Sequence, residues 1–94
     1  AYIYHSSVVE VSSIYEIFIT LNRQFPRAPL VMELTFMDQE YIIINNHLKC
    51  CGDGVIDPEN EWDEETRRRD ACNFLDQYIT VNFDNQPVIL VGDF

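Results

Sequence analysis

The sequence predicts an α+β fold in which a mixed sheet is crossed by one helix. Two stretches, Tyr41 to His47 and Pro87 to Gly92, carry unbroken runs of aliphatic residues, which is typical of strands buried on both faces. A long connection separates them, and it holds one clear helical pattern, Glu64 to Ile79. A connection of this kind normally places its two strands parallel, so we expect them to be parallel neighbours.

A third strand is predicted before this unit. In Leu30 to Phe36, every second side chain is a large apolar one, and the positions between them hold Val31, Glu33 and Thr35. This alternation indicates a half-buried strand. The short polar segment Met37-Asp38-Gln39 has the length of a hairpin connection to the strand that follows.

The first part of the chain is less regular. Ala1 to His5 and Val8 to Val11 are rich in strand-forming residues and are predicted to be two strand pieces. Ser12 to Asn22 fits both helical and strand spacing, and we expect irregular strand and loop there. Pro26 and Pro29 keep the next segment extended and out of any helix.

The helix has recognisable start signals. Asp63 is the expected N-cap, and acidic residues follow it at the positive end of the helix dipole. We expect the ion pairs Glu64–Arg68 and Glu65–Arg69 at the favourable i,i+4 spacing. The run Arg67-Arg68-Arg69 is therefore interpreted as a paired, solvated face and not as a nucleic-acid patch.

Composition limits the function classes. Ninety-four residues suit one small domain or a piece of a larger one. Six basic residues against sixteen acidic ones give a net charge of −10, which argues against broad binding of nucleic-acid phosphates. A metal-bridged phosphate substrate stays compatible, because acidic residues hold the metal. No stretch has the apolar length of a membrane span.

The cysteines and the acidic loop leave alternatives open. Cys50 and Cys51 are adjacent and rarely bridge each other without strain, so one of them could pair with Cys72, or all three could be reduced and packed. The redox compartment stays undecided. The loop from Gly52 to Asp63 holds several carboxylates but does not match an EF-hand, and a solvated loop is expected. A calcium-stabilised extracellular module is the alternative.

Four stretches resemble the endonuclease/exonuclease/phosphatase family, whose members include deoxyribonuclease I-like nucleases. Pro-Val-Ile-Leu-Val-Gly-Asp-Phe at 87–94 resembles the family's Gly-Asp-Phe-Asn strand, and Phe-Pro-Arg-Ala-Pro at 25–29 resembles its Phe-x-Arg-x-Pro segment. His-Leu-Lys at 47–49 resembles its His-Leu-x signature, and the Arg-rich helix is similar to a helix of the family. Together these stretches cover most of the chain.

The resemblance implies a fold and an activity. The fold would be part of a four-layer α/β sandwich, with residues 1–94 as its central segment, lacking the N- and C-terminal portions. The activity would be that of a metal-dependent phosphoesterase or nuclease, which hydrolyses a phosphate ester with metal-activated water. Its substrate would be a nucleic acid, a phospholipid head group or an inositol phosphate, and the remainder of the domain would be a partner.

The resemblance also implies site residues. His47 would donate to the scissile phosphate, Asp93 would lie beside the attacking water or ligate the metal, and Arg27 would contact the substrate. The metal would be Mg²⁺, or Mn²⁺ or Ca²⁺, held only when the family's other ligands are present. The family's metal-binding glutamate would precede Ala1, and neither Glu10 nor Glu16 matches its motif.

The residues give an independent geometric expectation. His47 and Asp93 both follow predicted parallel strands, whose carboxyl ends meet at one edge of the sheet, so we expect them to face one crevice. Because several family ligands have no counterpart here, we expect the 94-residue piece alone to be inactive. The rival interpretation is a non-catalytic binding module on the same scaffold.

Overall fold

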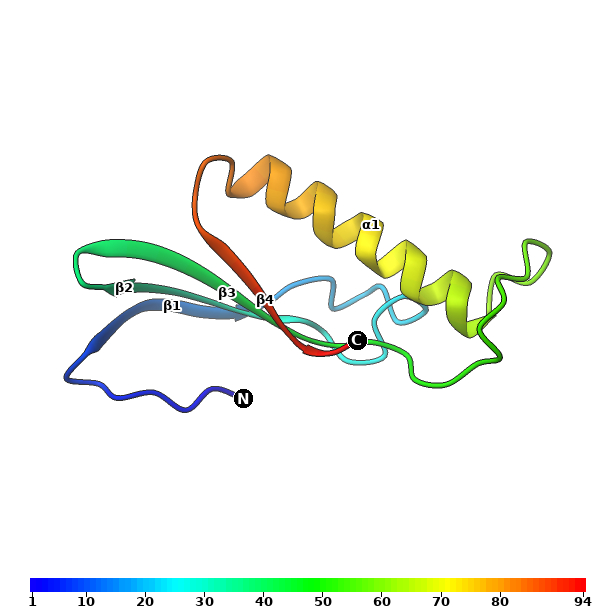
Figure 1. Cartoon of the computed structure of the whole chain (residues 1–94), viewed down its shortest axis with the longest axis horizontal. Coiled ribbons are helices and arrows are strands. Elements are labelled where there is room, and N and C mark those ends of the chain that lie inside the picture. Colours follow the sequence, from blue (N-terminus) through cyan, green and yellow to red (C-terminus); the bar gives the residue numbers. More distant parts are fainter.

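The computed structural model describes all of residues 1–94 as a four-stranded sheet with one helix (Figure 1). The elements in chain order are β1 (Val9–Glu16), β2 (Leu30–Phe36), β3 (Gln39–His47), α1 (Glu64–Asn82) and β4 (Val88–Asp93). In space the strands follow the order β1-β2-β3-β4; the first two pairings are antiparallel, and β3 and β4 are parallel. The mixed sheet with a crossover helix is therefore confirmed.

The start of the chain differs from the prediction. Residues 1–5 form no strand, although β1 begins close to the predicted Val8 to Val11 piece. They run along the side of the sheet opposite α1, where the Tyr2 hydroxyl donates to the carbonyl oxygens of Leu30 and Ile43 (Figure 1). Strand propensity alone does not make a strand, because each strand needs a neighbour for its backbone groups.

β1 is irregular, as expected. Its register against β2 shifts between Val11 and Ser13, which leaves Ser12 as a bulge. The Ser12 hydroxyl donates to the Glu33 carbonyl oxygen at 3.0 Å, so the interruption is hydrogen-bonded to the neighbouring strand. The chain leaves the sheet after Glu16, so strand followed by loop is confirmed.

The hairpin between β2 and β3 is also confirmed. Met37 and Asp38 form its turn with φ values of 50° and 62°. Two central residues with positive φ are the mark of the turn whose twist matches antiparallel strands. The turn sets the register that pairs Phe36 with Gln39 and Leu30 with Asn45.

The core lies between one face of the sheet and α1. Val31 and Ile44 from the sheet and Ala71 from the helix are fully buried. The nine-residue cluster also draws on the segment between β1 and β2, and it consists of Ile17, Phe25, Val31, Ile42, Ile44, Leu48, Ala71, Leu75 and Phe83. In β3, which runs beneath α1, burial follows a period of two, with Ile42, Ile44 and Asn46 buried.

The opposite side of the sheet, which we call the open face, carries the strand side chains that point away from α1. It holds an open apolar depression of about 380 Å³, lined by Val9, Leu34, Phe36, Tyr41, Ile43 and Ile89. The prediction that β4 is buried on both faces is wrong for this chain, since Ile89 is 46% exposed and Leu90 41%. β4 is an edge strand, and no second layer covers it.

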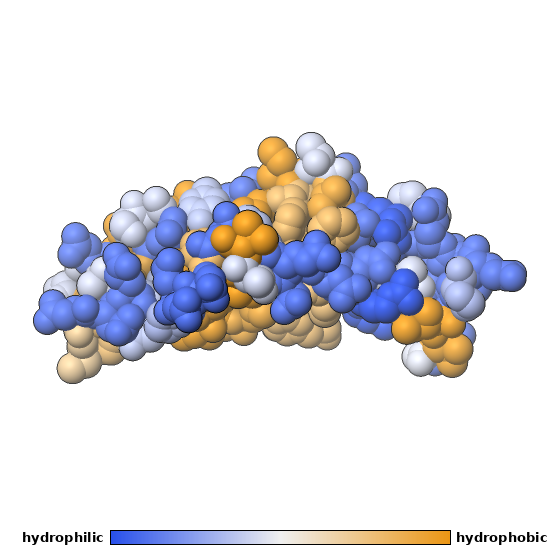
Figure 2. All heavy atoms as spheres, turned by 90° about the horizontal axis from the view of Figure 1, so that it is seen from above, coloured by the Kyte–Doolittle hydropathy of each residue, from blue (hydrophilic) through white to orange (hydrophobic).

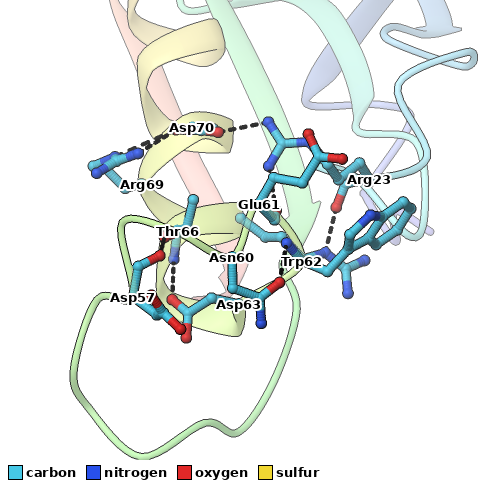
Figure 3. A network of polar contacts seen from close by, with 10 residues as sticks. Arg23, Asp57, Asn60, Glu61, Trp62, Asp63, Thr66, Arg69 and Asp70 are labelled. Atoms are coloured by element: carbon cyan, nitrogen blue, oxygen red, sulfur yellow. Dashed lines mark hydrogen bonds and ion pairs between the residues drawn. The ribbon is translucent and has the colours of Figure 1, made fainter.

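The start of α1 is fixed as predicted, but its ion pairs are different. Asp63 Oδ2 accepts from the Thr66 amide at 2.9 Å, which holds the pKa of Asp63 below its ordinary value (Figure 3). Both predicted i,i+4 pairs are wrong. Instead Arg68 pairs with Glu65 at 3.0 Å, and Asp70 accepts from the guanidinium groups of Arg69 and Arg23.

The ion pairs shift because tertiary neighbours compete for the same arginines. Arg23, from the segment before β2, lies 2.6 Å from Asp70 and also donates to the Glu61 carbonyl oxygen, so it ties three segments together (Figure 3). Arg67 donates to the Arg23 carbonyl oxygen and lies over the Trp62 ring. All three arginines of the run 67–69 are thus engaged within the chain, Arg68 and Arg69 in ion pairs and Arg67 with a carbonyl oxygen and an aromatic ring.

The molecule is elongated, with extents of 49 × 25 × 23 Å. Seen from the helix side, much of its surface is hydrophilic, and apolar atoms gather mainly near the middle of the long axis (Figure 2). α1 does not combine the length and the apolar character that a membrane-spanning helix requires.

Candidate functional site

The parallel pairing of β3 and β4 brings His47 and Asp93 to the same edge of the sheet. The two residues are partners in the register, and both are exposed. The Leu48 amide donates to the Asp93 carbonyl oxygen at 3.0 Å, so the ladder is still intact where the two side chains leave it. Adjacent parallel strands lie about 4.8 Å apart, which places both side chains within reach of one small ligand.

Arg27 joins this pair from the segment that precedes β2. Its Nη1 atom lies 3.2 Å from Nδ1 of His47. An arginine guanidinium can only donate, so Nδ1 accepts and the neutral imidazole carries its proton on Nε2. The structure therefore brings together all three residues that the sequence singled out, and it leaves the His47 Nε2–H free to serve as a donor.

The two asparagines before His47 lie on opposite faces of the sheet. Asn45 belongs to the face of β3 that also carries His47, and its Nδ2 donates to the Ala1 carbonyl oxygen at 3.3 Å. Asn46 is the buried one, 2% exposed, on the helix side of the sheet. The alternation of a strand decides this, because residues 45 and 47 share a face and residue 46 does not.

Asn46 is held by backbone carbonyls but is only partly satisfied. Its Nδ2 donates to the Ile44 carbonyl oxygen at 3.2 Å and to that of Val91 at 3.5 Å, which links β3 to β4 behind the site. Its Oδ1 is buried without a hydrogen-bond partner. A buried carbonyl oxygen without a donor is costly.

Gly92 allows the two strands to meet at this edge. It is the register partner of Asn46, and its φ is 129°. A Cβ atom at this position would overlap the Asn46 carbonyl oxygen. The glycine before Asp93 is therefore required by the backbone, both for its conformation and for the close approach to β3.

The three side chains border an open depression of about 290 Å³, which Asn45 and Gly92 also line. Volume alone does not select it, because a depression of about 400 Å³ lies near the β2–β3 hairpin beside Ser6 and Asp38. What distinguishes the depression beside His47 is its chemistry: a guanidinium, an imidazole and a carboxylate converge there.

The depression offers one residue that could ligate a metal ion. Asp93 is the one carboxylate among its lining residues, and neither Glu10 nor Glu16 lines it. Magnesium is commonly held by one or two carboxylates together with substrate phosphates and several waters. One aspartate alone supplies fewer protein ligands than a resident metal ion usually has, so a metal here would need further ligands such as a phosphate ester and waters.

The other acidic residues are engaged differently. In the loop before α1, Asp53 and Asp57 each accept from a backbone amide two residues further on, at 2.9 and 3.0 Å, and so close local turns. Asp63, Glu64 and Glu65 approach one another within 4.8 Å, but Asp63 caps α1 and Glu65 accepts from Arg68. This group lies at the positive end of the helix, which disfavours a cation.

The cysteines form no disulfide. Cys50, Cys51 and Cys72 are all free and all exposed, so the expectation that reduced cysteines would be packed in the interior is wrong. Cys50 and Cys51 lie in the loop that leaves β3, and Cys72 lies on the outer side of α1.

Comparisons with known proteins add no identification: no model of a protein family, no curated protein and no solved structure matches this chain. The family resemblance thus depends on the four motifs alone. The site itself is described by its geometry.

Two contacts of the site were not predicted. The hydrogen bond between Arg27 and His47 has no signal in the sequence, since it depends on how the Pro26 to Pro29 segment passes the edge of the sheet. The placement of Asn45 does have a signal, because its spacing of two from His47 predicts a shared face.

Proposed function

We propose that this chain is the central part of a metal-dependent phosphoesterase or nuclease of the endonuclease/exonuclease/phosphatase type. The observation that carries the proposal is the convergence of His47, Asp93 and Arg27 at one sheet edge. Cationic and hydrogen-bond-donating groups beside a carboxylate are what the hydrolysis of a phosphate ester needs: donors for the phosphoryl oxygens, and a group that orients water.

Each residue has a separate role in this proposal. His47 donates from Nε2 to a phosphoryl oxygen, because Arg27 occupies Nδ1. The remaining N–H groups of Arg27 hold a second oxygen of the same phosphate, a task that its planar guanidinium performs well. Asp93, on the neighbouring strand, accepts a proton from water or helps to hold the metal.

A bound Mg²⁺ would neutralise charge on the phosphoryl oxygens. Asp93 is the residue of this chain that would hold it, and Asn45 offers an amide oxygen at the same depression. The chain's own donors would bind and orient the ester. The class of ester, whether nucleic acid, phospholipid head group or inositol phosphate, is left open by these three residues.

The proposed fold is one half of a four-layer α/β sandwich. The open face supports this, because its depression of about 380 Å³ is lined entirely by aliphatic and aromatic residues. A second sheet packed on that face would bury Ile89 and Val91, the exposed side chains of β4 that lie on it. That sheet, with further metal ligands, would belong to the remainder of the domain.

Nuclear magnetic resonance of the full 94-residue chain tests the site. The chain has two histidines, and His5, which is exposed and bonded to Ser7, serves as the internal reference. We expect inorganic phosphate to shift the ring signals of His47 but not those of His5, and Mg²⁺ to strengthen this response. Asp93→Asn should abolish the effect of Mg²⁺, whereas Asp84→Asn, in the exposed turn after α1, should not. Equal shifts at both histidines would overturn the proposal.

Turnover separates the enzyme from a binding module. The piece alone is expected to bind phosphate without hydrolysing a phosphodiester, because it supplies only one carboxylate to the depression. Addition of the flanking chain should create Mg²⁺-dependent hydrolysis that Asp93→Asn removes. If the longer protein binds phosphate at His47 but hydrolyses no ester, the non-catalytic binding module is correct.

A further inference from the structure

The loop that follows β3 presents two neighbouring thiols to solvent. Cys50 and Cys51 are both free and exposed, and their sulfur atoms lie 2.7 Å apart. The Cys51 thiol donates to the Cys50 sulfur, so the two side chains point toward each other instead of toward opposite sides of the backbone. Cys51 adopts a φ of 73°, a backbone conformation that residues other than glycine seldom take.

The backbone around this pair is held by the first turns of α1. Arg68 Nη1 donates to the carbonyl oxygens of Lys49 and Cys51, at 2.8 and 2.7 Å. Its other nitrogen pairs with Glu65 Oε1 at 3.0 Å, and the same oxygen accepts from the Gly54 amide at 2.7 Å. The peptide groups on both sides of the thiol pair are thus fastened to a helix, and the positive φ of Cys51 persists because its surroundings hold it.

We propose that Cys50 and Cys51 are a redox-active dithiol, which small disulfides such as glutathione disulfide oxidise reversibly to a disulfide between the two neighbours. Two observations carry this: the sulfurs already face each other, and the backbone conformation that brings them together is fixed by Arg68. The proposal is independent of the phosphate site and of the family resemblance.

The reaction proceeds by two exchanges. The Cys50 thiolate attacks one sulfur of glutathione disulfide, which breaks its S–S bond, forms a mixed disulfide on Cys50 and releases one glutathione thiolate. The Cys51 thiolate then attacks the Cys50 sulfur, forms the intramolecular bond and releases the second glutathione thiolate. The two protein thiols lose two electrons in total, glutathione disulfide gains them, and the two thiol protons end on the two glutathione molecules.

The Cys51 thiol is assigned the second step. Its contact with the Cys50 sulfur raises the pKa of Cys51, which disfavours the Cys51 thiolate as the first attacking group. Thiolates and not thiols attack disulfides, and exposure of both sulfurs gives the oxidant access. Cys72 on α1 is exposed as well and serves as the reference thiol within the same molecule.

The product is expected to be easily reduced. A disulfide between adjacent residues closes a small ring and departs from relaxed disulfide geometry, which makes it more reducible. Strained and exposed disulfides have the more oxidising potentials and are the labile ones. Reduced glutathione should therefore return the pair to two thiols, and the site would respond to the ratio of the two forms of glutathione.

The test is oxidation of the full chain in glutathione buffers, followed by mass spectrometry and peptide mapping. We expect a species that has lost two hydrogens and keeps one free thiol, Cys72, and we expect reduced glutathione to restore all three thiols. Cys72→Ser should behave like the native chain, whereas Cys51→Ser should stop at a glutathione adduct on Cys50. Stable glutathione adducts on the native pair, with no loss of two hydrogens, would refute the proposal.

A second measurement separates the folded arrangement from mere adjacency in sequence. The equilibrium constant for ring closure should be about fivefold higher in the native chain than in guanidinium chloride, the order of magnitude of one hydrogen bond. Arg68→Ala should lower the native constant toward the unfolded one, and Arg69→Ala, which removes only the contact with Asp70, should not. Equal constants in the folded and unfolded chain would show that the fold contributes nothing to this chemistry.

Discussion

The guanidinium of Arg27 and the imidazole of His47 share a hydrogen bond of 3.2 Å, Nη1 to Nδ1, although the residues lie on different segments. Arg27 comes from the loop before β2, and His47 ends β3. Because the guanidinium only donates, this contact selects the neutral imidazole tautomer with its proton on Nε2. The tautomer decides which nitrogen can donate to a ligand in the depression.

The first prediction concerns this tautomer. In Arg27→Ala, the neutral His47 ring should lose its fixed tautomer and show a mixture of Nδ1–H and Nε2–H forms. Nitrogen-15 shifts of the ring, recorded at about pH 8 where an ordinary histidine is neutral, measure the populations. Arg69→Ala, which removes an exposed arginine far from the site in sequence, is the control. An unchanged tautomer in Arg27→Ala would contradict the hydrogen bond.

The second prediction concerns Gly92. Gly92→Ala should lower the free energy of unfolding by roughly 2–4 kcal/mol, because its φ of 129° is hostile to a side chain and the new Cβ would strike the backbone of Asn46. Gly54→Ala is the matched control: it shares a positive φ of 84° but has open space around the added carbon. Its cost should stay near 1 kcal/mol. Urea denaturation of both variants measures the difference, and equal costs would mean that the close approach of β4 to β3 is not as described.

The third prediction concerns the acid limb of stability. The hydrogen bond from Arg23 holds the pKa of Asp70 below its ordinary value of 3.8 (Figure 3). In the unfolded chain this carboxyl binds its proton at the higher pH, so the contribution is fully present above about pH 4 and is lost as the pH falls through the folded pKa. Asp70→Asn should therefore destabilise the chain near neutral pH and flatten the decline in acid.

Urea unfolding at several pH values between about 2.5 and 6 measures this effect. The exposed Asp84→Asn should reproduce the native pH profile. A native slope in Asp70→Asn would mean that the ion pair with Arg23, which joins α1 to the segment before β2, does not persist in solution.

The fourth prediction tests which face of the sheet holds the core. Ile44 is fully buried beneath α1, so Ile44→Ala should cost about 2–5 kcal/mol. Ile89→Ala changes an open-face residue that is 46% exposed, and its cost should be roughly 1 kcal/mol in the isolated chain. Chemical denaturation compares the two. A larger loss for Ile89→Ala would show that the open face is covered in solution, by a second copy of the chain or otherwise.

Much of the architecture could be predicted because it depends on local patterns. The proline-ended run before β2, the hairpin at Met37 and Asp38 and the helix cap at Asp63 are each specified by a few neighbouring residues. The parallel pairing of β3 and β4 followed from the length of the connection. From that pairing came the meeting of His47 and Asp93, the part of the candidate site that sequence reasoning could reach.

The failures share a different cause. Residues 1–5 have strand-forming side chains but no strand to pair with. β4 has a fully apolar run but lies at the edge of the sheet, where only Val88 is partly buried. The ion pairs of α1 were predicted from spacing along the helix, yet Asp70 binds Arg23 from a distant segment and Arg68 binds the loop after β3. In each case the outcome depends on which other segment lies nearby.

For this protein, then, the amino-acid order alone determined the strands, the helix and the polar residues at the strand ends, because hydrophobic periodicity, capping and turn formation act over a few residues. Only the tertiary structure decided that Arg27 binds His47 and that Arg68 holds the backbone around the two thiols. These contacts depend on how one segment passes another. A single hydrogen bond contributes little free energy and produces no recognisable sequence pattern, so it could not be predicted.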